Sequence, residues 1–458
     1  MSTRWFRESD RVGSVLLHFS SCFESESVAL PLTSGALRLL TQREFSLQKA
    51  RIKARMKGAA ELQTMAAFLF LHLALLFLLA GPAAPQTPGP AQLDLLDRSA
   101  DFGARLYRAV AGRTDDNVLL APLAVFAGML AVLGGTSGPT QNQLLQGLTL
   151  TGLDPQTLPD QFQALRDAVL QPALRLQQGA ALFLDRSFQT SPSFQDLVQT
   201  KYGGQMQSVS FSSPAEAQDV INRWVQDLTR HQDQNLLSSL DRRTQLLLVS
   251  AAAYQMRFSP LFNTSLTQVE RFYVDRYHVA MVPMMFRADK YFLAYDRGVK
   301  AGVLKLPMAD GAAMLAVLPD EDVDLTTVEE EMTSEKIRAW IRQLKKTKLE
   351  VQLPVFQLKR SYALKDVLQA LYVTQVFQDG DDFSSMGGAS GASLSQVYHA
   401  SVVTMDESGD DGGSGGGATA FSSPPPRLTF NRPFIFIIYQ QASGSLLLMG
   451  RVTNPTEN

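Results

Sequence analysis

The segment with the clearest chemical character in this chain is a stretch of peptide that a protease could cut. It runs from Val397 to Ile438 and contains a polar, glycine-rich part that has too few apolar residues to pack. Strand-like apolar runs flank this part, Ser401–Met405 before it and Phe434–Ile438 after it. Loops longer than about 12–15 residues are uncommon in compact domains and are usually functional or disordered. The pattern predicts two ordered strands that hold a long exposed loop, which is how a bait for a protease is built.

Residues for catalysis or for a bound cofactor do not occur in the patterns that those functions need. The sequence has no G-x-S-x-G, no P-loop and no G-x-G-x-x-G after a strand, and its five histidines lack metal-ligand spacing. The run Gly412–Gly417 follows Asp410 and Asp411, whose charges would repel a phosphate. The single cysteine, Cys22, allows no disulfide or cysteine-based metal site within one chain. We therefore expect no enzymatic activity, no cofactor and no metal.

Composition and apolar spacing predict one large domain of mixed structure. The 458 residues are 45% hydrophobic, and the net charge of −2 gives no reason to expect nucleic acid or an anionic membrane as a partner. The spacing predicts helices at Leu93–Val110, Leu119–Leu133, Leu158–Leu176 and Thr333–Lys346, and central strands buried on both faces at Ala180–Leu184 and Gln245–Ala253. Strands and helices that do not alternate strictly indicate the α+β class.

Residues before the predicted domain indicate secretion. A basic run that ends at Lys57 precedes the apolar run Ala66–Ala80, and small residues follow from Gly81 to Pro85. This order is that of a secretory signal peptide, and the apolar run is shorter than the roughly 20 residues of a membrane span. We expect residues 1–55 to be an extension of the gene model or unstructured, 56–84 the signal peptide, 85–92 a linker and 93–458 the folded domain. The initiator, Met1, Met56 or Met65, stays open; the mature chain is expected to be extracellular, without an integral membrane span.

Five spaced motifs resemble those of the serpin family. They are Asn117–Pro122, Ile221–Val225, Val282–Met285, Leu428–Ile438 and Gly450–Pro455. The resemblance covers about residues 95–458 and is to the plasma members of the family. It implies an α+β serpin fold, with three β-sheets, about nine helices and an exposed reactive-centre loop. It also implies a monomeric inhibitor of serine proteases in plasma rather than an enzyme.

The resemblance locates the bond that a chymotrypsin-like serine protease would attack. Thr419–Ser422, followed by prolines, resembles a reactive-bond segment and places the bond between Phe421 and Ser422. Counting from the hinge glycine, Gly409, places it near Ser423 instead, between Ser422 and Ser423. Both positions stay open, and the sequence does not name the target protease.

The hinge of the loop departs from the family pattern. Inhibitory serpins insert the cleaved loop into the central sheet, and they carry a threonine and several alanines after the hinge glycine. Here Gly409 is followed by Asp410, Asp411, Gly412 and Gly413, and six glycines lie between 409 and 417. An unpaired carboxylate inside a sheet is costly, and each glycine adds roughly 0.5–1 kcal/mol relative to alanine. Two functions stay open: an inhibitor, or a non-inhibitory carrier, binding protein or angiotensinogen-like precursor.

Three residues resemble the site through which one plasma serpin binds protein Z. They are Arg276, Tyr277 and Glu330, so the resemblance implies a protein Z-like plasma partner. Glu330 belongs to the acidic run Asp320–Glu331, for which charge alone predicts a solvated turn and helix face. Asn263 begins the only N-x-S/T sequon, a glycosylation site in a secreted chain.

The predicted core also shows a family feature and departures from it. Serpins carry a structural histidine on the strand before the loop, and we expect His399 to be buried and hydrogen-bonded in this role. Three positions beneath the sheet, where the family usually has two serines and an asparagine, hold Ala121, Ala124 and Ser250. Phe286 stands where many members carry one half of a Lys–Glu pair.

Overall fold

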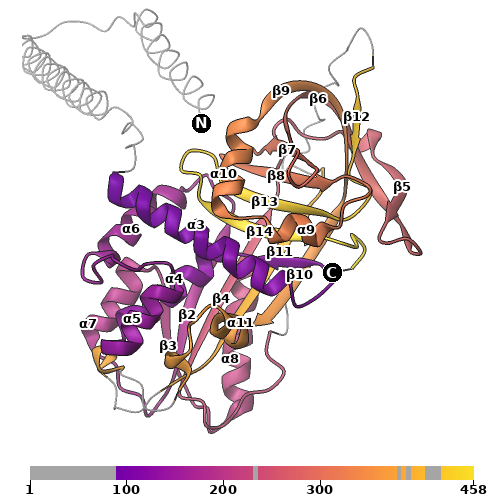
Figure 1. Cartoon of the computed structure of the whole chain (residues 1–458). Coiled ribbons are helices and arrows are strands. Elements are labelled where there is room, and N and C mark those ends of the chain that lie inside the picture. The colour runs from indigo at the N-terminus through magenta and orange to yellow at the C-terminus, as the bar shows by residue number, and fades with distance from the viewer. Residues whose placement is uncertain (1–88, 231–235, 379–382, 388–392, 408–423, 458) are drawn as a thin grey trace, which may run out of the picture. The chain divides into compact units, whose positions relative to one another are not determined.

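The computed structural model describes residues 89–457 except 231–235, 379–382, 388–392 and 408–423. Nine α-helices lie in the described part (Figure 1): α3 Pro90–Ala111, α4 Pro122–Gly134, α5 Gly138–Gly147, α6 Leu158–Val169, α7 Pro192–Asp196, α8 Pro214–Leu228, α9 Leu325–Glu330, α10 Ser334–Gln343 and α11 Lys365–Ala370. A π-helical turn, Leu197–Lys201, and three 3₁₀ turns, Thr264–Leu266, Gln375–Phe377 and Ser384–Met386, complete the helical elements. None of the described helices is long and apolar enough to cross a membrane.

A five-stranded sheet forms one half of the fold, in the order β10-β11-β4-β2-β3. Its strands are β10 Phe356–Ala363, β11 Leu394–Met405, β4 Leu246–Gln255, β2 Gln177–Asp185 and β3 Gln205–Val209. The central strand β4 is buried from Leu246 to Tyr254, and β2 is buried from Ala180 to Leu184. The two predicted central strands are therefore confirmed: a strand covered on both faces is apolar throughout.

The other nine strands form a single hydrogen-bonded sheet, which corrects the expectation of three separate sheets. The order is β1-β14-β13-β8-β7-β6-β9-β12, with β5 paired to β6. The strands are β1 Val118–Leu120, β5 Gln268–Tyr273, β6 Val279–Asp296, β7 Ala301–Pro307, β8 Ala312–Pro319, β9 Lys345–Pro354, β12 Arg427–Thr429, β13 Phe434–Gln440 and β14 Leu446–Val452. The cause is the length of β6, which pairs with β5 through its first six residues, Val279 to Met284, and with β7 through its last five, Phe292 to Asp296.

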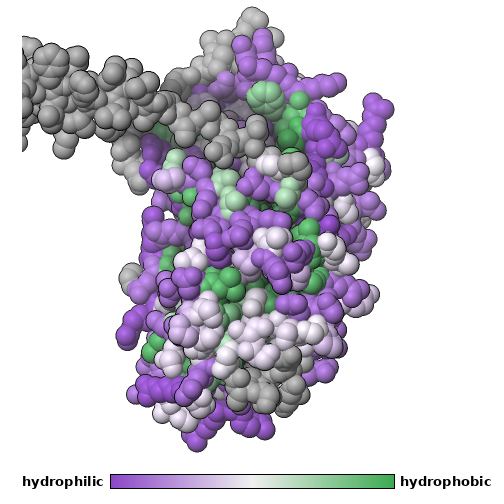
Figure 2. All heavy atoms as spheres, turned by 90° about the vertical axis from the view of Figure 1, so that its left-hand side faces the viewer, coloured by the Kyte–Doolittle hydropathy of each residue, from purple (hydrophilic) through white to green (hydrophobic). Residues whose placement is uncertain are grey.

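Helices α4 and α8 cover opposite faces of the five-stranded sheet. Leu246 and Leu248 of β4 belong to the main core together with α4, whereas Leu247 and Val249 belong to a second core with Ile221 of α8. Side chains alternate along a strand, so neighbouring residues point to opposite faces. The face that carries α5, α6 and α7 is mostly hydrophilic, with apolar residues in small separate areas (Figure 2).

Two predicted helix boundaries were wrong, and proline explains both. The helix expected from Leu119 begins instead at Pro122, and Val118–Leu120 forms a short strand paired with β14. Proline favours the first helical position and disfavours a helical residue before it. The helix expected to run from Leu158 to Leu176 ends at Val169, three residues before Pro172, since helices usually end before the residue that precedes a proline.

Candidate functional site

The two ends of the candidate loop are fixed in different sheets. Before it, β11 ends at Met405 in the five-stranded sheet; after it, Arg427 begins β12, which pairs in parallel with β9. Nε of Arg427 lies 2.9 Å from Oε2 of Glu350, and its guanidinium lies 5.5 Å from the ring centroid of Phe286. The C-terminal end of the loop is therefore anchored by backbone, charge and aromatic contacts.

The residues predicted to carry the loop chemistry lie outside the described residues. These are the hinge residues Gly409, Asp410, Asp411, Gly412 and Gly413, and the reactive-bond candidates Phe421, Ser422 and Ser423. The structure therefore describes the two anchors but none of these eight residues.

The boundary between β4 and β11 in the five-stranded sheet is called the slot here. It is closed, because the two strands are hydrogen-bonded to each other. β11 and β4 run parallel and pair from Leu394 and Leu246 to Thr404 and Gln255. The backbone N–H of Met256 also donates to the carbonyl of Thr404, 3.0 Å away. A strand entering between β4 and β11 would have to separate them, and its side chains would meet the two buried cores.

His399 links both sides of this slot. The ring is fully buried, its Nε2 accepts from the backbone N–H of Ala121 at 3.0 Å, and its Nδ1 lies 2.9 Å from Oγ of Ser250, its cross-strand neighbour on β4. Because Nε2 accepts, Nδ1 carries the proton of the neutral ring and donates to Ser250. Burial lowers the pKa of His399 to about 3. The predicted buried structural histidine is confirmed, and Ser250 supplies its partner.

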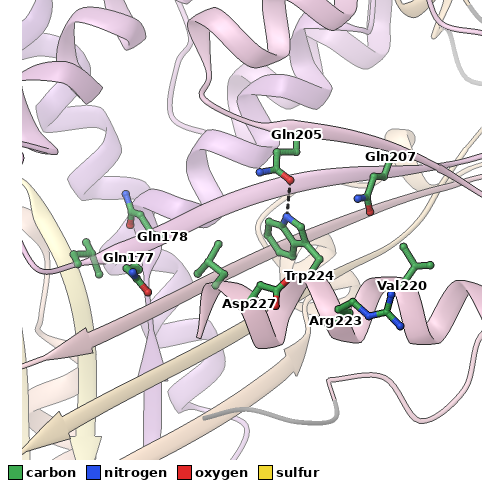
Figure 3. Close-up of a pocket in the computed structure, with 10 residues that line it drawn as sticks. Gln177, Gln178, Gln205, Gln207, Val220, Arg223, Trp224 and Asp227 are labelled. Atoms are coloured by element: carbon green, nitrogen blue, oxygen red, sulfur yellow. Dashed lines mark hydrogen bonds between the residues drawn. The ribbon is translucent and has the colours of Figure 1, made fainter. Parts of the chain in front are cut away.

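A polar cleft lies between α8 and the strands β2 and β3 (Figure 3). It encloses about 620 Å³, and the indole Nε1 of Trp224 at its centre donates to Oε1 of Gln205 at 2.9 Å. The Trp224 ring packs edge-on against Phe183, with centroids 6.2 Å apart. Amide side chains, Arg223 and Asp227 form the rest of its polar lining.

The predicted partner residues lie on two elements that face one groove. Tyr277, in the turn between β5 and β6, is 89% exposed. Asp275 shapes this turn: its Oδ1 accepts from the N–H groups of Tyr277 and His278, and a hydrogen bond from the His278 side chain lowers the pKa of Asp275. Arg276 lines a groove of about 1070 Å³ together with Leu325, at the start of α9.

Glu330 lies at the other end of α9, about 7.5 Å along the helix axis from Leu325. Its backbone carbonyl accepts from Nη1 of Arg108 at 3.0 Å, and its side chain is exposed. The structure thus places Arg276 opposite the start of α9, and Glu330 beyond the groove rather than in it.

A buried ion pair that the sequence did not reveal anchors α9. Nη1 of Arg451 on β14 lies 2.8 Å from Oε2 of Glu329, and the hydroxyl of Tyr107 on α3 donates to Oε1 of Glu329 at 2.6 Å. Burial raises the pKa of Glu329, and the bonds from Tyr107 and Arg451 act against this. The expectation of a fully solvated acidic run is therefore wrong at Glu329.

Asn263 is half-buried at the start of a 3₁₀ turn. Its Oδ1 accepts from the backbone N–H of Ser265 at 3.0 Å and from the Ser265 hydroxyl at 2.8 Å. In the described part of the chain, no cluster of histidine, cysteine, aspartate or glutamate could hold a metal ion.

The closed parallel slot, the buried histidine across it and a loop fixed between two sheets define the serpin architecture. The family model described as "Serpin (serine protease inhibitor)" matches residues 97–455, and the chain belongs to this family. The predicted α+β serpin fold is confirmed.

Individual relatives cover most of the chain. It is 30% identical over 369 residues to the human protein Z-dependent protease inhibitor, and the match covers 79% of this chain and 83% of the relative. It is also 29% identical over 374 residues to the alpha-1-antiproteinase of Callosciurus caniceps, over 80% of this chain and 90% of that protein.

Solved structures of two similar proteins share the fold. The mouse protein Z-dependent protease inhibitor is 29% identical with a TM-score of 0.74, and the match covers 80% of this chain and 98% of that one. Thyroxine-binding globulin in complex with thyroxine is 26% identical with a TM-score of 0.73, over 80% of this chain and all of that one.

Proposed function

We propose that the protein is a secreted, plasma-type inhibitor of a chymotrypsin-like serine protease and that a protein Z-like partner assists it. The observation that carries the proposal is the segment between Met405 and Arg427, which is fixed at both ends beside a closed slot in the sheet. Similarity to protein Z-dependent protease inhibitors supports the partner.

The proposed reaction follows the serpin mechanism. The serine of the protease attacks the carbonyl carbon of Phe421; the bond to Ser422 breaks, and the new amine of Ser422 takes the proton that the protease histidine received from its serine. The ester that results joins protease and loop. Insertion of the cleaved loop between β4 and β11 then releases strain stored in the native fold and carries the protease with it. During insertion the bond between His399 and Ser250 must open, since these residues face each other across the slot.

A second candidate is a non-inhibitory serpin that carries or binds another molecule. Asp410, Asp411 and the glycines after them favour it, because they oppose insertion. The same fold is found in thyroxine-binding globulin, whose solved structure holds thyroxine. Incubation with chymotrypsin separates the two functions: a covalent complex that survives SDS supports the inhibitor, and cleavage without any complex supports the second candidate.

Secretion without residues 1–55 is the expected fate of the chain, because the signal pattern starts after them. The N-terminus of the protein from the culture medium should lie between Gly81 and Gln86. Edman sequencing or mass spectrometry of the N-terminal peptide measures this. A cell-retained product that starts at Met1 contradicts it.

Substituting alanine for Tyr277 should weaken binding to protein Z at least tenfold, which is about 1.4 kcal/mol. The side chain is 89% exposed, so its removal takes away contact area without disturbing the core. Calorimetric titration with purified protein Z measures the change. Tyr372→Ala, which removes another exposed tyrosine, is the matched control and should leave the affinity unchanged. Equal affinities for both variants argue against the Arg276–Tyr277–Glu330 face.

A further inference from the structure

Exposed apolar side chains gather on one hairpin of the molecule, formed by β5 and β6. Val269 is 63%, Tyr273 44%, Val279 50% and Met281 58% exposed. No large hydrophobic residue of α5, α6 or α7 is exposed to this degree, in line with the mostly hydrophilic face in Figure 2. A contiguous exposed apolar area on a soluble protein marks an interaction site.

The register of the hairpin places these side chains on one face. Tyr273 pairs with Val279, and Arg271 with Met281, while Val269 lies two residues before Arg271. Directly paired residues and every second residue share a face of a sheet. The intervening residues Phe272 and Val282 point the other way, into the core. The outer face is therefore mostly apolar: of the six residues in its three pairs, Val269–Pro283, Arg271–Met281 and Tyr273–Val279, only Arg271 is charged.

This hairpin face, Val269, Tyr273, Val279 and Met281, continues into the groove beside α9. Tyr273 lines both that groove and a smaller hollow of about 260 Å³, which Val269 and Met281 also line. A stable protein interface buries about 800 Å² on each partner, more than four partly exposed side chains offer. A partner on the hairpin face must therefore also cover the neighbouring groove.

The charge of the groove defines the partner that fits it. Its lining contains seven carboxylates, those of Asp115, Asp116, Asp275, Asp320, Glu321, Asp324 and Glu457, and three guanidinium groups, those of Arg276, Arg432 and Arg451. The charge of Arg451 is already balanced by Glu329, which does not line the groove. The excess of negative charge is therefore larger than seven carboxylates against three guanidinium groups suggest. Complementary potentials favour a cationic partner and speed its association.

We propose that the hairpin face and the acidic groove form one docking surface for a protein that presents an apolar patch flanked by lysine or arginine side chains. This inference deepens the proposed partner face and rests on it. An anionic membrane does not fit, because the groove would repel it. A twofold contact between two copies of this chain would bring two acidic grooves together, which like charges oppose.

Purified protein Z is the probe, titrated against the full secreted chain at low and at physiological salt. Val279→Thr combined with Met281→Thr removes apolar surface but keeps strand-forming residues, and should weaken binding at least tenfold. Asp115→Asn combined with Glu321→Gln should slow association severalfold and reduce its salt dependence. Leu93→Gln and the pair Asp196→Asn with Asp219→Asn are exposed controls outside the surface and should change neither quantity.

The outcomes distinguish a failure of this docking surface from a failure of the proposed protein Z-like partner. If Tyr277→Ala weakens binding but the hairpin and groove variants bind as the wild type does, the docking surface is wrong and the smaller partner face stands. If the wild type does not bind protein Z, both fail. Sedimentation of the chain alone adds a third outcome: self-association that the Val279 and Met281 substitutions abolish would show that a second copy occupies the hairpin face, and would overturn the stated partner.

Discussion

Replacing Arg451 by methionine is expected to lower the free energy of unfolding by about 3–5 kcal/mol, because it leaves a buried carboxylate without its cation. Arg451 and Glu329 are 3% and 4% exposed, and their charged groups are 2.8 Å apart. Methionine fills a similar volume but donates no hydrogen bond. Arg451 also donates to the backbone carbonyls of Asp116 and Thr114, which lose these donors. The midpoint and slope of urea-induced unfolding measure the change.

Removing both charges should restore most of the lost stability. In the variant with methionine at both Arg451 and Glu329 no unpaired buried charge is left, and such replacements are often nearly neutral. Arg243→Met is the matched control, since Arg243 forms an exposed pair with Asp241 and exposed pairs contribute about 0–1 kcal/mol. If Arg451→Met costs no more than Arg243→Met, the buried pair does not stabilise the fold as argued.

The buried pair also bears on the proposed partner face. α9 has six residues, fewer than an isolated helix needs to be stable in water. Contacts made by Glu329 with α3 and β14 therefore hold the helix that ends in Glu330.

Much of the fold could be predicted from local sequence. The runs Ala180–Leu184 and Gln245–Ala253 are apolar without interruption, and a strand covered on both faces requires this. The boundaries at Pro122 and Pro172 were missed because apolar content outweighed the effect of proline on the preceding residue. The joining of two sheets through β6 could not be predicted, since it depends on pairing between residues far apart in the chain.

Residues of the candidate site could be predicted only where the sequence around one residue indicates its role. His399 could be placed because it lies in a strand pattern before the loop, where serpins carry a structural histidine. Glu329 was hidden in an acidic run; the available signal was Arg451, a charge inside the apolar strand Leu446–Val452 that requires a buried partner. The acidic groove gathers residues from 115 to 457, and no local pattern predicts such a set.

If the hinge makes the protein the non-inhibitory candidate, cleavage by chymotrypsin near Phe421 is expected to trap little protease and to raise the melting temperature little. In an efficient inhibitor the cleaved loop becomes a strand between β4 and β11, and the fold gains heat stability. Side chains alternate along a strand, so Asp410 and Asp411 would point to opposite faces of the sheet. Leu248 and Ala252 line one face of β4, and Val249 and Ala251 the other. An aspartate that enters either face must lose water or take up a proton.

The glycines add a second cost that a designed variant can remove. Alanine in place of Gly412, Gly413, Gly415, Gly416 and Gly417 should favour the strand by about 2.5–5 kcal/mol in total. Threonine for Asp410 and alanine for Asp411 remove both carboxylates and restore the residue types of inhibitory hinges. With both sets of changes, a covalent band on SDS gels and a large rise in melting temperature after cleavage are expected. The alanine set alone, with both aspartates kept, separates the entropic cost from the cost of burying charge.

Each result assigns the limit on protease trapping to a different part of the molecule. A wild-type chain that already gives a strong covalent band and a large rise in melting temperature refutes the argument that the hinge limits trapping. If the redesigned hinge still traps nothing, the distance from the hinge to the reactive bond, on which the two counts disagree, or the residues beneath the sheet set the limit instead. Of the residues beneath the sheet, Ser250 is the weaker explanation for absent trapping, because it makes the hydrogen bond to His399 across the slot at 2.9 Å. Ala121 offers only its backbone N–H to that ring, so Ala121→Ser in the redesigned chain is the next variant to measure.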